Sequence, residues 1–197
     1  MAKQENAPKT DRVNTQGHRR RKRVIGLLVL ALLTSTVVIA LRVRQQFQKN
    51  DALASAVQAN DLDEVLAMLR QGADPNSQLV YRTTPQTLEE TAQWIIGTRR
   101  FVWRSTPVLA VASTNGNAQI ADTLITQGAD IDQTSGDGWT ALMTAAGAGH
   151  SEVVRLLLRK RVAINARNLY GITALTVARM NTRQEVVQLL TQAGAHE

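Results

Sequence analysis

The sequence predicts an all-α protein: a solenoid of four stacked helix pairs, preceded by one transmembrane helix. The segment at 72–76 (GADPN) returns at 128–132 (GADID), in altered form at 161–165 (RVAIN), and again from Gly194. The successive intervals between these starting positions are 56, 33 and 33. A recurrence in this range is typical of stacked-repeat proteins, which present a surface rather than carry out chemistry. The second observation is an uncharged apolar run near the N-terminus.

The basic charge of the chain is concentrated before the repeats. The formal net charge is +7, yet residues 1–50 hold 11 Lys and Arg against 2 acids, and residues 51–197 hold 12 against 14. Binding to nucleic acid depends on neutralising phosphates with basic side chains, so a mildly acidic repeat region fits it poorly. We therefore expect no nucleic-acid partner, and residues 1–23 are interpreted as a basic N-terminal tail.

Residues 24–41 form an uncharged apolar run, VIGLLVLALLTSTVVIAL. A helix of this length spans about 27 Å, close to the hydrocarbon thickness of a bilayer. A buried core helix would need a partner domain that the segment 1–50 does not provide. A cleaved signal peptide is the main rival, because Val38-Ile39-Ala40 resembles a cleavage site, although the run is longer than an ordinary signal sequence. The sequence favours an uncleaved transmembrane helix, followed by a juxtamembrane linker at 42–50.

The flanking charges predict the orientation. Eight Lys and Arg precede the apolar run, including all of 19–23, and three follow it before residue 51. Positive residues stay in the cytoplasm, so this bias predicts a cytoplasmic N-terminus with the repeats translocated across a bacterial inner membrane. The run at 19–23 could also serve as a nuclear-localisation signal, and the reverse topology would leave the repeats in the cytosol.

Residues 51–197 align as four units, each with a short Ala-rich inner helix, a turn and an outer helix. Four columns of small or aliphatic residues fall in register in the last three units: Leu109, Leu142 and Leu175; Ala112, Ala145 and Ala178; Ile120, Val153 and Val186; Leu124, Leu157 and Leu190. The alanines predict close approach of neighbouring inner helices. Glycines such as Gly128 follow the outer helices, where a left-handed residue ends a helix at little cost.

The third unit, from Thr140-Ala141-Leu142 through Gly149-His150-Ser151-Glu152-Val153-Val154 to Leu158, closely resembles an ankyrin repeat. The resemblance covers 51–197 apart from the insertion described next. It implies an ankyrin-repeat solenoid of four repeats, whose β-hairpin fingers and inner helices line a concave face that binds proteins. Three residues depart from the pattern: Arg161 stands in place of the capping Gly, and Arg179 and Thr182 stand where Ala and Gly are usual.

The first interval, 56, is 33 plus 23 and places an insertion in the first finger, at about 77–105. Thr84-Pro85 is a helix-start signal, and the spacing of apolar residues predicts a helix over 85–96. An aromatic and basic strip, 99–104, follows. Four of the seven aromatic residues of the chain lie in this insertion and none lies in a repeat helix.

Tyr, Trp and Arg are enriched at the energetic centres of interfaces, so the rings and the contact positions implied by the resemblance are the candidate protein-binding residues. They are Trp94, Phe101, Trp103, Arg104, Asp137, Trp139, Leu169, Tyr170, Ile172 and Met180. Trp94 and Phe101 have an alternative use, since a short insertion must bury something to be ordered. They would then form the insertion's own small core.

We expect no enzyme, cofactor or metal site. The chain has no Cys, and its three His residues (His18, His150 and His196) lie too far apart in the sequence to have ligand spacing. The resemblance gives His150 a structural hydrogen bond in its turn. The sequence predicts a membrane-tethered protein-binding module, an accessory or protective partner of another protein. The alternative is a structural or assembly subunit of a membrane complex. Apolar residues in the divergent fourth unit would also permit self-association.

Overall fold

The structure is a computed structural model that describes the backbone of residues 11–81 and 104–196, and the side chains of 34–79 and 105–196. The chain divides into two compact units, Met1–Gln46 and Phe47–Glu197. The second unit contains the repeats and every residue of the site described below.

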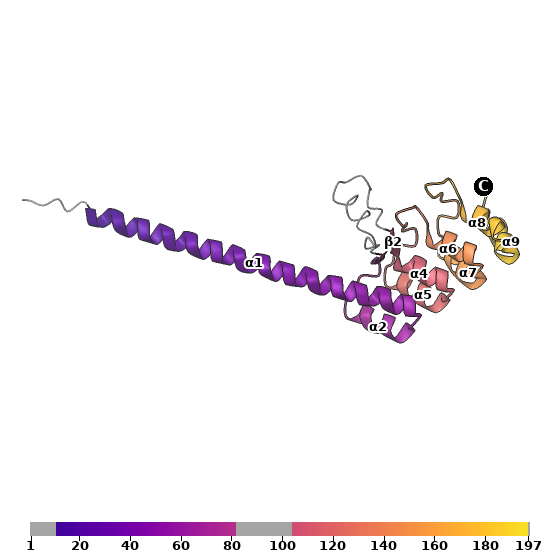
Figure 1. Ribbon diagram of the computed structural model, residues 1–197, viewed down its shortest axis with the longest axis horizontal. Coiled ribbons are helices and arrows are strands. Elements are labelled where there is room, and N and C mark those ends of the chain that lie inside the picture. The colour runs from indigo at the N-terminus through magenta and orange to yellow at the C-terminus, as the bar shows by residue number, and fades with distance from the viewer. Residues whose placement is uncertain (1–10, 82–103, 197) are drawn as a thin grey trace, which may run out of the picture. The chain divides into compact units, whose positions relative to one another are not determined.

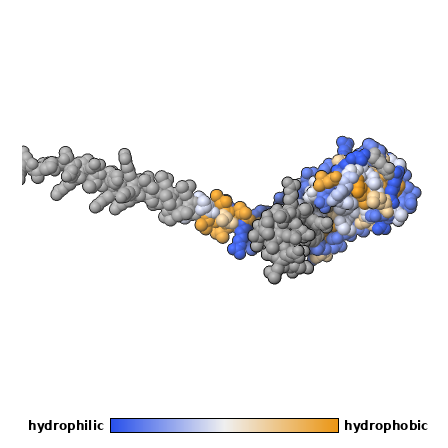
Figure 2. Space-filling view, turned by 45° about the horizontal axis from the view of Figure 1, so that its top comes forward, coloured by the Kyte–Doolittle hydropathy of each residue, from blue (hydrophilic) through white to orange (hydrophobic). Residues whose placement is uncertain are grey.

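Helix α1 (Asp11–Ala59) includes residues 42–50, for which the sequence predicts a juxtamembrane linker. In the first unit its described side chains are exposed, and several of them are large and apolar. These residues, exposed by 47 to 64%, are Val37, Val38, Ile39, Leu41 and Val43. Figure 2 shows them as an apolar surface on the helix. Within the described part of the chain, no helix combines the length and the apolar composition needed to cross a membrane.

The second unit is built from four helix pairs. Figure 1 shows that they follow one another along the unit. The end of α1 is the inner helix of the first pair. The remaining helices are α2 (Leu62–Arg70), α4 (Val108–Asn115), α5 (Ala118–Thr126), α6 (Ala141–Ala148), α7 (Ser151–Arg159), α8 (Ala174–Met180) and α9 (Gln184–Gln192). The inner helices α4, α6 and α8 contact one another in order, and the outer helices α2, α5, α7 and α9 do the same.

The columns predicted from the sequence form the core between these layers. All twelve registered residues, from Leu109 to Leu190, are at most 2% exposed. The alanine column is fully buried, because each Ala lies where two inner helices approach and a larger side chain would not fit. The predicted solenoid of four helix pairs is therefore confirmed.

The turns that join the helices repeat a left-handed backbone conformation. The residues between inner and outer helices have φ of 62° at Asn60, 76° at Gly116, 88° at Gly149 and 56° at Thr182. Those after the outer helices have φ of 84° at Gly72, 97° at Gly128, 62° at Arg161 and 87° at Gly194. Arg161 and Thr182 thus adopt the conformation that glycine supplies in other repeats, at a cost that glycine does not incur.

A ladder of side-chain hydrogen bonds also joins successive repeats. In each rung, a side-chain carbonyl or carboxylate oxygen accepts a backbone N–H from the next turn along the solenoid. The rungs are Asn50 to Asp74 (2.9 Å), Asn76 to Asp130 (2.7 Å), Asp132 to Ala163 (2.8 Å) and Asn165 to His196 (2.9 Å). The loops are therefore held at a fixed spacing, which positions the fingers next to one another.

The all-α prediction needs one correction. Strand β1 (Gln78–Tyr81) pairs antiparallel with β2 (Arg104–Pro107), in a register that sets Gln78 opposite Pro107 and Tyr81 opposite Arg104. The two strands are the ends of the predicted insertion. The resemblance implied a β-hairpin in this finger, but the residue pattern did not locate its strands, because each strand is very short and its partner is distant along the chain. The helix predicted over 85–96 lies outside the described residues.

Candidate functional site

The site lies where the fingers meet the inner helices. The third-repeat finger (residues 129–140) is joined to β2 because the N–H of Gly136 donates to the carbonyl oxygen of Ser105 (3.2 Å). The fourth-repeat finger (residues 162–173) is joined to the third because the N–H of Leu169 donates to the carbonyl oxygen of Asp137 (3.2 Å). The fingers and β2 therefore form a continuous edge above the inner helices.

Each finger closes through its own polar residue. In the third-repeat finger, the hydroxyl of Ser135 accepts the N–H of Trp139 (3.0 Å), and the N–H of Ser135 donates to the Trp139 carbonyl (2.9 Å). In the fourth, the side-chain oxygen of Asn168 accepts the N–H groups of Tyr170 (2.9 Å) and Ile172 (3.0 Å). These closures fix the backbone of the turns that carry Asp137 and Tyr170.

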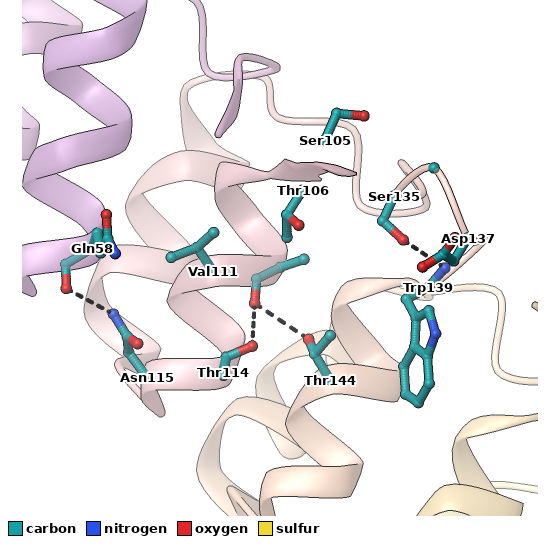
Figure 3. A pocket seen from close by; sticks show the side chains of 12 residues that line it. Gln58, Ser105, Thr106, Val111, Thr114, Asn115, Ser135, Asp137, Trp139 and Thr144 are labelled. Carbon is teal, nitrogen blue, oxygen red and sulfur yellow. Dashed lines mark hydrogen bonds between the residues drawn. The ribbon is translucent and has the colours of Figure 1, made fainter. Parts of the chain in front are cut away.

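Below this edge lies a groove of about 600 Å³, which we call the concave groove. It is lined by Gln58, Ser105, Thr106, Ala110, Val111, Thr114, Asn115, Ser135, Gly136, Asp137, Trp139 and Thr144. Figure 3 shows Gln58 and Asn115 at one end, the Trp139 indole at the other, and the threonines between them. The lining comes from three inner helices, from β2 and from the third-repeat finger. No single repeat could form it.

The polar groups on the groove floor are oriented by the backbone. The Thr114 hydroxyl donates to the carbonyl oxygen of Ala110 (2.9 Å), and the Thr144 hydroxyl donates to that of Ala141 (2.9 Å), with the Ala110 oxygen a longer alternative acceptor at 3.3 Å. A hydroxyl has one hydrogen, so a hydroxyl that gives it to a carbonyl is left with acceptor capacity only. At the far end, the Asn115 amide nitrogen donates to the carbonyl of Val57 (3.0 Å).

The structure brings some of the predicted binding residues together and separates others. Asp137 and Trp139 line the concave groove and are half-buried. Leu169 (75% exposed) and Tyr170 (70%) lie on the adjacent finger, and Met180 (69%) ends helix α8. Ile172 is half-buried and is not part of the groove lining.

The predicted residues of the insertion are not tested. Trp94, Phe101 and Trp103 lie outside the described residues. Arg104 is described only through its backbone, which begins β2.

Sequence reasoning missed most of the groove, although a signal was present. Thr114 and Asn115 occupy the same register as Gly147 and Ala148, since each pair is separated by one full repeat. Met180, a contact position implied by the resemblance, lies one further repeat along in the register of Thr114 and Gly147. Extending this contact register from the third repeat to the second identifies Thr114 and Asn115 as lining residues. Two further lining residues occupy predicted contact registers: Thr106 lies 33 residues before Trp139, and Gln58 lies 56 residues, the first interval, before Thr114.

A metal centre is not seen among the described residues. They contain no group of His, Asp or Glu side chains close enough to hold a metal ion. His150 follows Gly149 in the turn after α6, and its Nε2 is hydrogen-bonded to the carbonyl oxygen of Thr114 (2.9 Å). The imidazole therefore joins two repeats, in line with the structural role expected for it.

Comparison with known proteins agrees with this architecture. A family model described as ankyrin repeats in three copies matches residues 109–197. An ankyrin repeat-containing protein of Treponema pallidum is 40% identical over 94 residues, covering 47% of this chain and 32% of the relative. The human ankyrin repeat and KH domain-containing protein 1 is 40% identical over 90 residues, covering 45% of this chain and 4% of the relative.

A third relative aligns over more of the chain. An ankyrin repeat protein of fowlpox virus is 26% identical over 181 residues, which cover 82% of this chain and 53% of the viral protein. The chain thus spans between a few per cent and about half of the length of these three relatives. Their names share the repeat and no common activity.

Proposed function

Since residues 109–197 make this chain a member of the ankyrin-repeat family, we propose that it is a membrane-tethered protein-binding module. Ankyrin repeats mediate interactions between proteins and are typically not enzymes. The observation that carries the proposal is the concave groove, which opens beside exposed apolar residues at the fourth-repeat finger. The chain would act as an accessory or protective partner of the protein it holds.

The exposed residues support a partner on this side of the repeats. Leu169, Tyr170 and Met180 are the most exposed large apolar side chains among the described residues of the second unit, and none belongs to its core. Isolated apolar residues are common on surfaces, but adjacent exposed apolar residues on a finger joined to a groove, as Leu169 and Tyr170 are, are typical of a binding site. Leu169 is tied to Asp137 of the groove through the backbone, so the finger tip and the groove can contact one partner.

The membrane tether is proposed from residues 24–41. The run is uncharged, and the described apolar residues on α1, such as Ile39 and Leu41, are exposed. A lipid environment would cover them. With eight basic residues before the run and three after it, the N-terminus would be cytoplasmic and the repeats periplasmic at a bacterial inner membrane.

Site-specific photocrosslinking tests the binding proposal. A photoreactive amino acid at Thr106 or Thr114 in the full-length protein should capture the same partner from cells. The matched control is Gln188, an exposed residue on outer helix α9. A partner captured from Gln188 but from neither groove position would contradict the proposal.

Protease protection in spheroplasts tests the topology. External protease should digest residues 51–197 if the repeats are periplasmic. Resistance in intact spheroplasts, with digestion after lysis, would place the repeats in the cytosol.

The second candidate is a structural or assembly subunit of a membrane complex. The exposed apolar side chains of α1 favour it, because they could equally contact other membrane helices. A subunit of this kind should remain assembled after detergent extraction when Trp139 and Tyr170 are both changed to Ala, whereas a partner held by the groove should be lost. Recovery of differently tagged copies together would identify self-association instead.

A further inference from the structure

We infer that the Trp139 end of the concave groove receives an arginine side chain of the partner protein. This inference rests on the proposed binding function and adds the chemistry that the groove selects. It follows from three features of the described residues: the sign of the charge around the groove, the hydrogen-bonding capacity of its floor, and the pairing of a carboxylate with an indole.

The charge around the groove is negative. Asp137 is the one ionised side chain among the twelve lining residues. Eleven of those residues lie within 105–150, a segment that contains four Asp and no Lys or Arg. The following segment, 151–196, has the opposite balance, with seven Lys and Arg against two Glu. One of the four, Asp122 on outer helix α5, is paired with Lys160 (2.9 Å), so at the groove itself the negative charge is that of Asp137, which attracts a cation and repels an anion.

The floor of the groove favours a hydrogen-bond donor. The Thr114 and Thr144 hydroxyls both give their hydrogens to backbone carbonyl oxygens, with that of Ala110 within reach of each, so toward the groove they offer lone pairs. The Asp137 carboxylate likewise only accepts. A guanidinium group has five N–H donors and no acceptor, which matches a set of acceptors better than an amide or a hydroxyl would.

The indole of Trp139 adds the preference for a planar cation. Trp139 is half-buried and packs partly against the core, so its ring is held in place rather than free to turn. The hydrogen bond between Ser135 and Trp139 closes the finger and fixes the backbone of Asp137, which lies two residues before Trp139. A guanidinium stacks on an aromatic face while its edge donates to a carboxylate, whereas an ammonium acts as a point charge. The pair therefore fits arginine better than lysine.

Fluorine NMR of the full-length protein in neutral detergent, labelled with 5-fluorotryptophan, tests the assignment. The chain has three Trp, and Trp139→Phe identifies the Trp139 signal. The probes are the acetylated, amidated forms of arginine, of citrulline and of lysine. Citrulline has nearly the shape of arginine without its charge. The arginine probe should shift the Trp139 signal saturably, and the citrulline probe should bind at least tenfold more weakly.

Two variants show whether the carboxylate is responsible. Asp137→Asn should weaken arginine binding by about tenfold and leave citrulline binding unchanged. Asp130→Asn removes the same charge from the same segment at a residue outside the groove lining, and should have less than a threefold effect. Equal binding of arginine and citrulline, equal binding of arginine and lysine, the absence of a saturable shift, or equal effects of the two variants would each overturn the inference.

The binding proposal and the arginine inference can be contradicted independently of each other. If Thr106 and Thr114 capture a partner whose binding does not depend on Asp137, the groove binds proteins but not through arginine. If neither position captures a partner, the binding proposal itself fails.

Discussion

The backbone N–H of Leu169 donates to the carbonyl oxygen of Asp137 over 3.2 Å, which ties the exposed fourth-repeat finger to the wall of the concave groove. Leu169 is 75% exposed and its neighbour Tyr170 is 70% exposed. The bond uses backbone atoms alone, so it leaves both side chains available. One partner could therefore contact the groove and the finger tip together.

Replacing Leu169 and Tyr170 with Ala should weaken partner capture by at least tenfold without loss of stability. Exposed side chains outside the core change the free energy of unfolding by only about 0.5 kcal/mol. Urea unfolding and capture from the Thr114 photocrosslinker measure the two effects in the full-length protein. A large loss of stability would mean that the tip packs within the protein instead.

Arg161→Gly should stabilise the protein by about 1 kcal/mol, because a side chain in the left-handed region is strained and glycine is not. Arg161 has φ of 62° at the position where the other repeats have Gly72, Gly128 and Gly194. Urea unfolding measures the gain. Arg161→Lys is the matched control, since it keeps both the charge and the strain. A gain of equal size in Arg161→Lys would show that the conformation is not the cause.

Gly116→Ala should cost more stability than Gly128→Ala. Both glycines have positive φ, 76° and 97°, so each variant incurs a left-handed penalty of about 1 to 2 kcal/mol. A Cβ at Gly116 would also lie 2.5 Å from Nδ1 of His150, while at Gly128 nothing lies within 4 Å. We expect about 1 to 3 kcal/mol of further loss from this overlap. Adding His150→Ala should recover part of it, and equal losses in the two single variants would contradict the account.

The pKa of Glu185 should rise toward its ordinary value when Ser151 is changed to Ala. Hydrogen bonds from Ser151 and then from Arg155, whose guanidinium lies 3.1 Å away, hold the pKa of this carboxyl below its usual range. A pKa lowered in the folded state means that the stabilisation is present above the unfolded-state pKa and is lost as the pH falls through the folded-state pKa. Carbon NMR titration of the carboxyl group measures the shift. A larger shift in Arg155→Gln would reverse the assigned order of causes.

Much of the fold was predictable because ankyrin cores are built from local, periodic patterns. The column of Ala112, Ala145 and Ala178 follows from spacing, and each member is buried as predicted. The left-handed backbone at Arg161 follows from register as well. The bounds and register of β1 and β2 were not predictable from spacing, since each strand is short and its partner lies beyond an insertion of irregular length.

The sequence by itself determined the number of repeats, their register and the place of the insertion, because these depend on residue spacing along the chain. It also identified Asp137 and Trp139, two of the twelve residues that line the concave groove. Only the tertiary structure decided that Gln58, Thr106 and Thr144 meet there, and that the Ala110 carbonyl contacts two of the hydroxyls. A groove depends on the distances between repeats, and helix packing together with backbone hydrogen bonds between fingers fixes those distances.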